Sequence, residues 1–302
     1  MMENMFPAFF TESINRQYGM ETVAQILSGM QQPRCTSLRA NPLRASIDDI
    51  AAMLTEAGLA YERLPWYDAA FLLPAGSEAV LHSQPLYESG GFYMQSLSAM
   101  LPPLVLAPQS GADILDMAAA PGGKTAQMAA MTANKANITA VEVNAIRADR
   151  LRHNLQKQGV TRVNVMVRDG RKLEDFFRFD QILLDAPCSG SGTMLASDPT
   201  GIRAFSEKLV RNSAALQVQL LRKALSLLKK GGTLVYSTCS ILEVENEAVV
   251  RSALKGTSAQ LEPIELPGIE DLPRLPVMLD DTLCVRPTER YEGFFIARIR
   301  KP

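Results

Sequence analysis

Residues 114–129 read ILDMAAAPGGKTAQMA, in which an apolar strand, a turn of small residues and the start of a helix follow one another. A glycine-rich turn between a strand and a helix lies where ligands bind at the carboxyl end of a parallel sheet. A dinucleotide site needs the spacing G-x-G-x-x-G, which this turn does not have. A phosphate-binding P-loop needs G-x-x-x-x-G-K-[ST]. Gly123, Lys124 and Thr125 fit its end, but Ala118 stands where its first glycine belongs.

The third possibility for this turn is a site for S-adenosylmethionine. The turn consists of Ala118, Ala119, Ala120, Pro121, Gly122, Gly123 and Lys124, and its small residues let the backbone approach the methionine part of the ligand. Glu142, at the end of the next strand, could accept hydrogen bonds from both ribose hydroxyls. Asp169 could accept one from the adenine amine. One acidic residue at a strand end is common by chance, but the ordered series of turn, Glu142, Asp169 and Asp185 is far more specific.

From about Ser110 onward, apolar strands alternate with helical segments, which predicts a parallel sheet covered by helices on both faces. We expect strands at 112–117, 137–143, 163–167, 181–185 and 232–238, with two more near 282–286 and 293–299. Helices are expected at 144–158, at 205–230 with Gly231-Gly232 as its end, and at 243–254. The predicted fold class is α/β, with the seven-stranded, Rossmann-like, mostly parallel sheet of class I methyltransferases.

The first 90 residues have a different pattern from the rest of the chain. Residues 35–41, 46–64 and 69–74 indicate strand, helix and strand in that order, which predicts a small α+β unit. The segment GFYMQSLSAM (91–100) would join this unit to the remainder. We therefore expect a small N-terminal domain over 1–90 and a methyltransferase domain over 91–302.

Two cysteines follow the fourth and fifth expected strands, Cys188 in DAPCSG and Cys239 in STCS. Neighbouring parallel strands end at the same edge of a sheet, so both thiols and Asp185 should meet beside the glycine-rich turn. Free cysteines are most often buried and inert, and we interpret Cys35 and Cys284 in this way. Cys188 and Cys239 differ from these two, because they lie at the ends of two neighbouring strands, and this position favours a chemical role for both.

Paired thiols beside a methyl donor suit the alkylation of an unactivated pyrimidine carbon. Carbon 5 of cytosine is too weak a nucleophile to take a methyl group directly. A thiolate that adds to carbon 6 turns the ring into an enamine, whose carbon 5 can attack the sulfonium methyl group. Asp185 could hold the base and favour protonation of ring nitrogen 3. The thiol of a free cysteine has a pKa of about 8.5, and either Lys124 or a nearby amide array could favour the thiolate.

The chain resembles the Nop/Sun (Fmu) family of RNA cytosine-5 methyltransferases, in particular its bacterial ribosomal RNA branch. The matching segments are SLRAN (37–41), GFYMQSLSAM (91–100), LDMAAAPGGKT (115–125), RDGRKL (168–173), DAPCSGSG (185–192), LVYSTCS (234–240), EVENE (243–247) and GFFIAR (293–298). The resemblance implies that Cys239 is the nucleophile and that Cys188 assists product release. It also implies that the turn, Glu142, Asp169 and Asp185 bind the cofactor, and that the N-terminal unit is of an RNA-binding type.

Basic residues add candidates of a different kind. The basic residues of 147–162 form a cluster that we interpret mainly as a solvated helix face. Arg147 is the exception, because it is close to Glu142 and the expected adenosine. Arg39 and Arg203 are candidates to line the approach of RNA. A net charge of −1 lacks the basic excess typical of nucleic-acid binders, although a local basic face can bind phosphates on a neutral protein.

Three alternatives to a ribosomal RNA enzyme remain open at this point. The same reaction on transfer RNA fits the same motifs. A DNA cytosine methyltransferase would use Cys188 as its nucleophile, but the E-N-V motif expected there is not reproduced by Glu245-Asn246-Glu247. A non-catalytic RNA-binding assembly factor could keep the fold, and the two intact cysteines argue against it.

The composition limits the setting in which the protein works. The chain has 302 residues, 47% of them hydrophobic and 21% charged, as in a soluble globular protein. No apolar run reaches about 18 residues, and the N-terminus lacks a basic segment followed by an apolar one, so we expect neither a membrane span nor a secretory signal. Four cysteines without a C-x-x-C pair, and two histidines, predict no metal site and no disulfide framework. We expect a cytoplasmic monomer.

Overall fold

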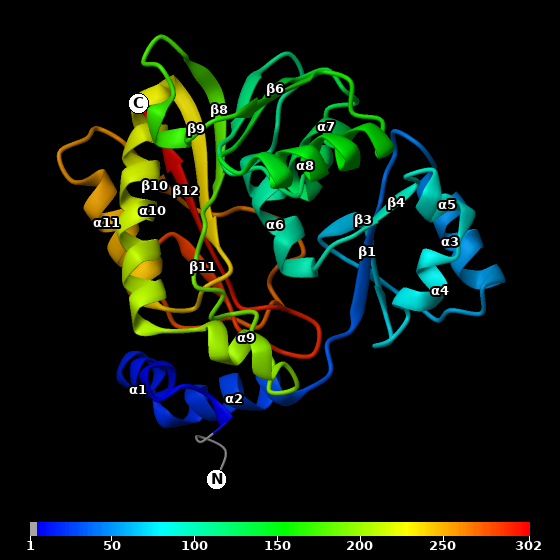
Figure 1. Ribbon diagram of the computed structural model, residues 1–302, viewed down its shortest axis with the longest axis horizontal. Coiled ribbons are helices and arrows are strands. Elements are labelled where there is room, and N and C mark those ends of the chain that lie inside the picture. Colours follow the sequence, from blue (N-terminus) through cyan, green and yellow to red (C-terminus); the bar gives the residue numbers. More distant parts are fainter. Residues whose placement is uncertain (1–4) are drawn as a thin grey trace.

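A mostly parallel sheet forms the centre of the larger part of the molecule (Figure 1). The computed structural model describes residues 5–302. Within them, the strands of this sheet are β5 (Asp113–Asp116), β6 (Asn137–Glu142), β7 (Val163–Val167), β8 (Phe179–Asp185), β9 (Leu228–Thr238), β10 (Gln260–Glu262), β11 (Thr282–Val285) and β12 (Phe294–Arg300). The order is β10-β12-β9-β8-β5-β6-β7, and β11 pairs with β12. The α/β fold class predicted from the sequence is confirmed, with the three-residue β10 as a strand that the sequence did not indicate.

The order of the strands decides where a ligand can bind. The first strand of the sheet, β5, pairs in parallel with β6 on one side and with β8 on the other. The chain therefore winds outward in both directions from β5, and the crevice at such a switch point binds ligands at the carboxyl ends of the strands. β9 continues the parallel set beyond β8, whereas β12 runs antiparallel to β9.

Helices cover the two faces of this sheet. They are α6 (Leu97–Leu106), α7 (Gly123–Met131), α8 (Ala145–Lys157), α9 (Pro199–Ala204), α10 (Glu207–Leu227) and α11 (Glu247–Leu254), with short 3₁₀ helices η2 (Gly170–Lys172) and η3 (Glu243–Glu245). Successive residues of a strand point to opposite faces. Ile182 and Leu184 of β8 accordingly pack with α10, and Leu183 between them packs with α6. Both faces of the parallel strands are thus buried.

Two helix boundaries differ from those expected. The helix predicted for 205–230 ends at Leu227, and Gly231-Gly232 lies inside β9 instead of ending the helix. There Gly231 has a positive φ of 73°, and the amide of Gly231 donates to the carbonyl of Lys301. The helix predicted for 243–254 is divided into η3 and α11 at Asn246.

The smaller part of the molecule is a four-stranded antiparallel sheet in the order β2-β3-β1-β4. Its elements are β1 (Thr36–Ala40), α3 (Ile47–Glu56), β2 (Glu62–Leu64), β3 (Tyr67–Leu73), α4 (Glu78–His82), α5 (Pro85–Glu88) and β4 (Phe92–Met94). The predicted strand, helix and strand are present as β1, α3 and β3, but the helix predicted over 46–64 ends at Glu56, and the last three residues of that range form β2. The edge strand β4 comes from the segment expected to join the two parts, and it pairs with β1.

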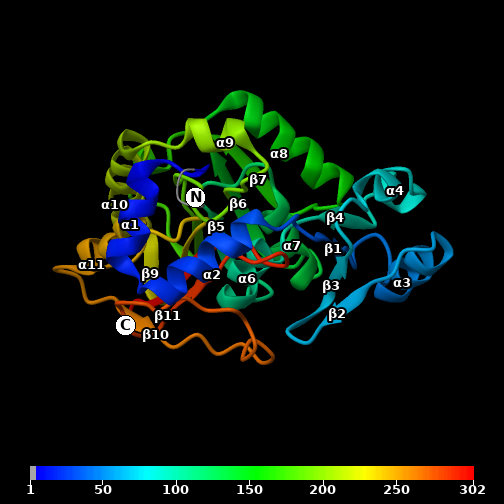
Figure 2. The same ribbon diagram turned by 90° about the horizontal axis from the view of Figure 1, so that it is seen from below.

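Two helices precede the small sheet, α1 (Ala8–Gln17) and α2 (Met20–Gln31), and they lie against the larger part (Figure 2). The ring of Phe10 in α1 meets that of Phe205 edge to face, with 5.8 Å between the centroids. Phe10 and Ile14 belong to the same apolar cluster as α10. The residues before β1 therefore share the core of the larger part, and the division of the chain at residue 90 stays a prediction. No helix within residues 5–302 is long and apolar enough to cross a membrane.

Candidate active site

A cavity of about 420 Å³ lies at the carboxyl ends of β5, β6 and β8, within the range of roughly 300–1,000 Å³ typical of ligand sites. It brings together many of the residues singled out from the sequence. They are Ala118, Ala120, Glu142, Arg147, Asp169, Asp185, Cys188 and Cys239. Met117, Val143, Leu216 and Leu220 add apolar wall. Its position is that expected from the switch of winding direction beside β5.

The rest of the glycine-rich turn stands behind this wall. Ala119, Pro121, Gly122, Gly123 and Lys124 do not line the cavity. The amide of Ala119 donates to the carbonyl of Val141, which fixes the turn on β6. Gly122 has a φ of 107°, and a Cβ there would lie 2.8 Å from Leu151 Cδ1, so the turn needs glycine at this position. These residues set the course of the backbone, and contact between them and a ligand stays a prediction.

The two carboxylates expected to hold the adenosine have different surroundings. Glu142 is 3% exposed, and its Oε1 accepts a hydrogen bond from the amide of Asn144 at 2.9 Å. Its Oε2 lies 3.7 Å from the guanidinium of Arg147, which also donates to the carbonyl of Ala120. Arg147 thus links the end of β6 to the glycine-rich turn. The Glu142 carboxylate retains acceptor capacity toward the cavity.

Asp169 is engaged by Arg171, a partner that the sequence did not identify. Arg171 Nε lies 3.0 Å and Arg171 Nη2 lies 2.6 Å from oxygens of Asp169. The hydrogen bonds from Arg171 lower the pKa of Asp169. Gln219 of α10 in turn accepts from Arg171 at 2.9 Å. The carboxylate is therefore held in a fixed orientation with its charge compensated.

A further acidic residue, Asp116, lies buried beside the glycine-rich turn without lining the cavity, and it also escaped the sequence analysis. It ends β5, is 1% exposed, and accepts a hydrogen bond from Thr125 Oγ1 at 2.6 Å. Burial raises the pKa of Asp116 to about 6. Its place as the last polar residue of a strand directly before the glycine-rich turn is the signal that could have marked it.

The two cysteines expected to carry the chemistry meet across the two loops. The Sγ atoms of Cys188 and Cys239 are 2.9 Å apart. Asp185 lies beside them, with its Oδ2 at 2.6 Å from Lys124 Nζ and its Oδ1 accepting from Ser237 Oγ at 2.7 Å. The convergence of two thiols and one carboxylate predicted from the strand ends is present.

The electrostatics of the site keep Cys239 protonated. The contact with Cys188 is the main cause, and burial the next, that the pKa of Cys239 is raised well above its usual value. Burial opposes the charge of Lys124, but the attraction of Asp185 outweighs it and the pKa of Lys124 is raised. Lys124 therefore pairs with Asp185. Of the two groups considered for favouring the thiolate, Lys124 does not offset the causes that raise the pKa of Cys239.

Arg39 is in a different place from the one expected. We considered it for the approach of RNA, but its side chain is fully buried between β1 and the larger part of the molecule. It donates to the side chains of Gln95 and Gln158 at 3.2 and 2.9 Å. Arg39 therefore belongs to the junction between the two parts. Arg203 is exposed on α9, and its approach to RNA stays a prediction.

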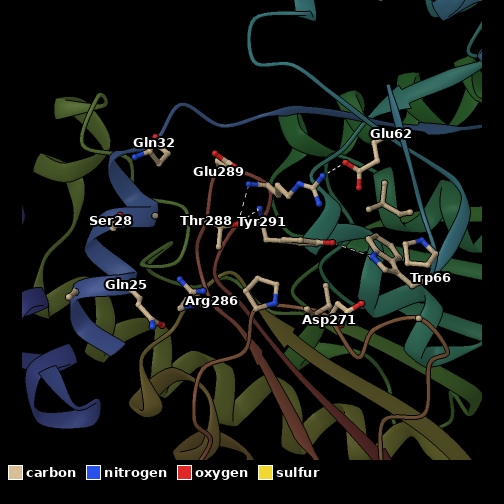
Figure 3. Close-up of a pocket in the computed structure, with 18 of the residues that line it drawn as sticks. Gln25, Ser28, Gln32, Glu62, Trp66, Asp271, Arg286, Thr288, Glu289 and Tyr291 are labelled. Atoms are coloured by element: carbon tan, nitrogen blue, oxygen red, sulfur yellow. Dashed lines mark hydrogen bonds and ion pairs between the residues drawn. The ribbon is translucent and has the colours of Figure 1, made fainter. Parts of the chain in front are cut away.

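A second cavity, of about 780 Å³, lies between α2, the turn from β2 to β3 and residues 268–291 (Figure 3). Trp66 Nε1 lies 3.3 Å from the hydroxyl of Tyr291, and Arg290 pairs with Glu62. None of the described residues lining it is a cysteine, and neither the glycine-rich turn nor Asp185 contributes to its wall. Among residues 5–302, no three His, Cys, Asp or Glu side chains cluster as metal ligands. The candidate active site is therefore the cavity that contains both thiols.

Two family models match the chain. One, described as "16S rRNA methyltransferase RsmB/F", covers residues 103–300. The other, a ferredoxin-like domain of the same group of methyltransferases, covers residues 6–78.

Curated relatives and solved structures agree with these models. The chain is 34% identical to the mouse 28S rRNA (cytosine-C(5))-methyltransferase, over 97% of this chain and 38% of that protein. It is 35% identical to the ribosomal RNA small subunit methyltransferase F of Vibrio atlanticus, over 92% of this chain and 60% of that protein. The crystal structure of a methyltransferase homolog protein from Pyrococcus horikoshii superposes with a TM-score of 0.83 at 32% identity, covering 98% of this chain and 100% of that one. The chain thus spans less than two thirds of the length of both curated relatives.

Proposed function

The chain belongs to the family of 16S rRNA methyltransferases RsmB/F, and from this we propose that it transfers a methyl group from S-adenosylmethionine to carbon 5 of cytosine in RNA. The family predicted from the sequence motifs is thereby confirmed. The observation that carries the proposal is the pair of thiols, 2.9 Å apart, in the wall of the ligand cavity. Ribosomal RNA is the proposed substrate, since the relatives compared above are named for it.

The residues of the cavity fit the proposed cofactor. The buried Glu142 and the oriented Asp169 offer acceptors for ribose hydroxyls and an adenine amine, and Ala118 and Ala120 leave room beside them. When bound, the cofactor supplies a methyl group made electrophilic by its sulfonium centre. Asp185 and Cys239 line the same cavity, so the base and the methyl donor would meet there.

The side chains divide the remaining work. We propose that the sulfur of Cys239 bonds to carbon 6 of the cytosine while the thiol proton passes to ring nitrogen 3, which leaves the ring as a neutral enamine. Asp185, held by Lys124 and Ser237, faces ring nitrogen 3 and favours its protonation, which offsets the charge of the ring. After transfer, a base takes the proton from carbon 5, and the electrons of that bond restore the double bond between carbons 5 and 6. The sulfur leaves carbon 6 with its bonding electrons and recovers its proton from ring nitrogen 3. Cys188, in contact with Cys239, is placed to assist this release.

The setting follows from the same chemistry. Both thiols must stay reduced, so we propose a cytoplasmic protein.

Covalent trapping distinguishes the roles of the two cysteines. Cys188→Ala and Cys239→Ala variants are incubated with total RNA and S-adenosylmethionine, and protein–RNA adducts are separated on denaturing gels. Cys188→Ala should accumulate an adduct because release is slowed, and Cys239→Ala should form none. The buried Cys284 provides the control, since Cys284→Ala should resemble wild type. The reverse pattern would exchange the roles of the two cysteines. If neither wild type nor any variant methylated RNA or formed an adduct, the proposed methyltransferase activity would be refuted.

A further inference from the structure

The two cysteine loops are joined behind the sulfurs by one carboxylate. Cys188 and Cys239 are each followed by a serine, Ser189 and Ser240. Glu245, the last residue of η3, accepts hydrogen bonds from both of these serines and is fully buried. The sequence places Glu245 inside EVENE, a family motif to which we assigned no role of its own.

The bonds to the first loop fix the residue directly after Cys188. Glu245 Oε1 accepts from the amide of Ser189 at 2.8 Å, and Oε2 accepts from Ser189 Oγ at 2.6 Å. Gln217 of α10 strengthens this end, because its Nε2 donates to the carbonyl of Pro187 at 2.8 Å. Hydrogen bonds to Glu245 and Gln217 therefore fix the peptide groups on both sides of Cys188.

The bond to the second loop fixes the residue directly after Cys239. Ser240 Oγ donates to Glu245 Oε2 at 2.7 Å and accepts from the amide of Leu242 at 3.1 Å. Ser191 Oγ lies 2.8 Å from Ser240 Oγ and accepts from the amide of Ile241. Since the single proton of Ser240 is directed at Glu245, the proton of Ser191 must point to Ser240. In this series of hydrogen bonds, each hydroxyl group thus donates in the direction of the Glu245 carboxylate.

Glu245 is itself anchored to the sheet. Its backbone carbonyl accepts from the hydroxyl of Tyr236 in β9 at 2.6 Å. The next residue, Asn246, breaks the helix, and its side chain accepts from Thr238 Oγ1 at 2.6 Å and donates to the carbonyl of Ser240 at 3.0 Å. The interruption between η3 and α11 therefore turns both side chains into the loop of Cys239.

We propose that Glu245 is a positioning residue that sets the separation of the Cys188 and Cys239 sulfurs by joining the two loops through Ser189 and Ser240. Its carboxylate touches neither sulfur in the network described here. It acts one residue away from each thiol, so its effect on the reaction passes through their positions. The consequence for catalysis rests on the proposed function, whereas the consequence for the two thiols does not.

The test compares Glu245→Gln with Glu243→Gln. Glu245→Gln keeps the shape of the side chain, but an amide nitrogen in place of Oε2 cannot accept from Ser240 Oγ, whose own acceptor positions are filled by Leu242 and Ser191. The bond to the loop of Cys239 is therefore lost. Glu243 belongs to the same 3₁₀ helix and pairs at the surface with Arg251, which makes it the matched control. Both variants are measured as full-length protein by three readouts, namely thermal unfolding, methyl transfer and disulfide formation by diamide.

Diamide takes two electrons and two protons from a pair of thiols as their S–S bond forms, so its rate reports how the sulfurs are placed without any RNA or cofactor. Glu245→Gln should slow formation of the Cys188–Cys239 disulfide by about 10-fold or more and reduce kcat by about 10-fold to 100-fold. The KM for S-adenosylmethionine should stay unchanged, because the cofactor end of the cavity is untouched. Glu243→Gln should match wild type in both rates.

An unchanged diamide rate in a folded Glu245→Gln protein overturns the positioning role, even if kcat falls. If wild type methylates no RNA, the proposed function fails while the diamide rates still decide the role of Glu245. If Glu245→Gln does not fold, Ser240→Ala removes one bond of the same join and must slow disulfide formation in the same way. A wild-type rate in that variant would also overturn the proposal.

Discussion

The thiol of Cys239 is held in its protonated form by its neighbour. The contact with Cys188 and burial both raise the pKa of Cys239, so this sulfur is a weak nucleophile in the structure described. A thiol that is unreactive without substrate is protected against adventitious alkylation. The contact with Cys188, for which we propose a role in product release, therefore also lowers the reactivity of Cys239.

Removing Cys188 should make Cys239 more reactive toward small alkylating reagents. In Cys188→Ala the largest cause of the raised pKa is gone, so the thiolate fraction near neutral pH rises. Each unit by which the pKa falls should speed alkylation by iodoacetamide about 10-fold at pH 7.5. Peptide mapping by mass spectrometry measures the modified fraction of Cys239 over time, with Cys284→Ala as control. Equal or slower alkylation in Cys188→Ala would contradict this explanation.

The buried Asp116 should give the protein a specific dependence of stability on pH. Its pKa in the folded protein is raised to about 6 from a usual 3.8, so the folded state binds the proton more tightly than the unfolded state. Protonated Asp116 therefore adds to the free energy of unfolding. This contribution is complete below the pKa of the unfolded state and is lost as the pH rises through the pKa of the folded state, by at most about 3 kcal/mol. Asp116→Asn should therefore gain stability relative to wild type between pH 4.5 and 7. Urea denaturation measures the difference, with the half-buried Asp113→Asn as control, and parallel curves for all three proteins would refute the assignment.

At the scale of elements, the active site is a contact between loops that follow different strands. The amide of Gly192, after β8, donates to the carbonyl of Cys239 at 2.9 Å, and the amide of Gly293, before β12, donates to the carbonyl of Gly192 at 2.8 Å. A Cβ at Gly192 would lie 2.1 Å from the carbonyl oxygen of Gly293. The loops of Cys188, Cys239 and β12 can approach one another only because glycine stands at this crossing.

Gly192→Ala should therefore separate the cysteine loops. The added methyl group has no space, so the loop of Cys188 must shift by a substantial fraction of an ångström, and a displacement of about 1 Å can cost about 100-fold in rate. We expect a matching loss of kcat and a lower Tm. Gly19→Ala is the control, because a Cβ there meets nothing within 4 Å. Wild-type turnover by Gly192→Ala would contradict the close approach of the loops.

The sequence predicted the elements well and their ends less well, for physical reasons. Periodic apolar residues indicated β5 to β9 and the helices α8 and α10, because burial leaves a strong pattern. The short α9 was not indicated. The break at Asn246 was missed because its side chain bonds to a loop preceding it in the chain, a contact that local pattern does not encode. Gly231 and Gly232 suggested the end of a helix, but they lie in the first part of β9, where their backbone groups form hydrogen bonds with Lys301.

At the scale of the whole molecule, the small sheet is fastened to the larger part by buried polar groups. Arg39 and Asn41 of the SLRAN segment both bond to Gln158, at the end of α8. From the other side, Trp66 meets the hydroxyl of Tyr291. The sequence could identify Arg39 as a notable residue but not as a buried one, since its partners lie more than fifty residues away.

These contacts predict that both parts unfold together. Trp66 is the single tryptophan of the chain and lies in the smaller part, between β2 and β3, so its fluorescence reports on the junction. Far-ultraviolet circular dichroism reports mainly on the helices and strands of the larger part. The two probes should give coincident urea transitions, as expected for one cooperative unit. A separate, earlier fluorescence transition would show that the N-terminal part unfolds independently.

The central claim is that Cys239 attacks the cytosine, and the most direct test locates the adduct. Cys188→Ala is reacted with RNA and S-adenosylmethionine, digested with protease and nuclease, and analysed by mass spectrometry. We expect a cytidine nucleotide, increased by one methyl group, bound to the peptide that contains Cys239. A nucleotide attached to any other residue, or a methylated RNA product without any covalent adduct, would contradict it.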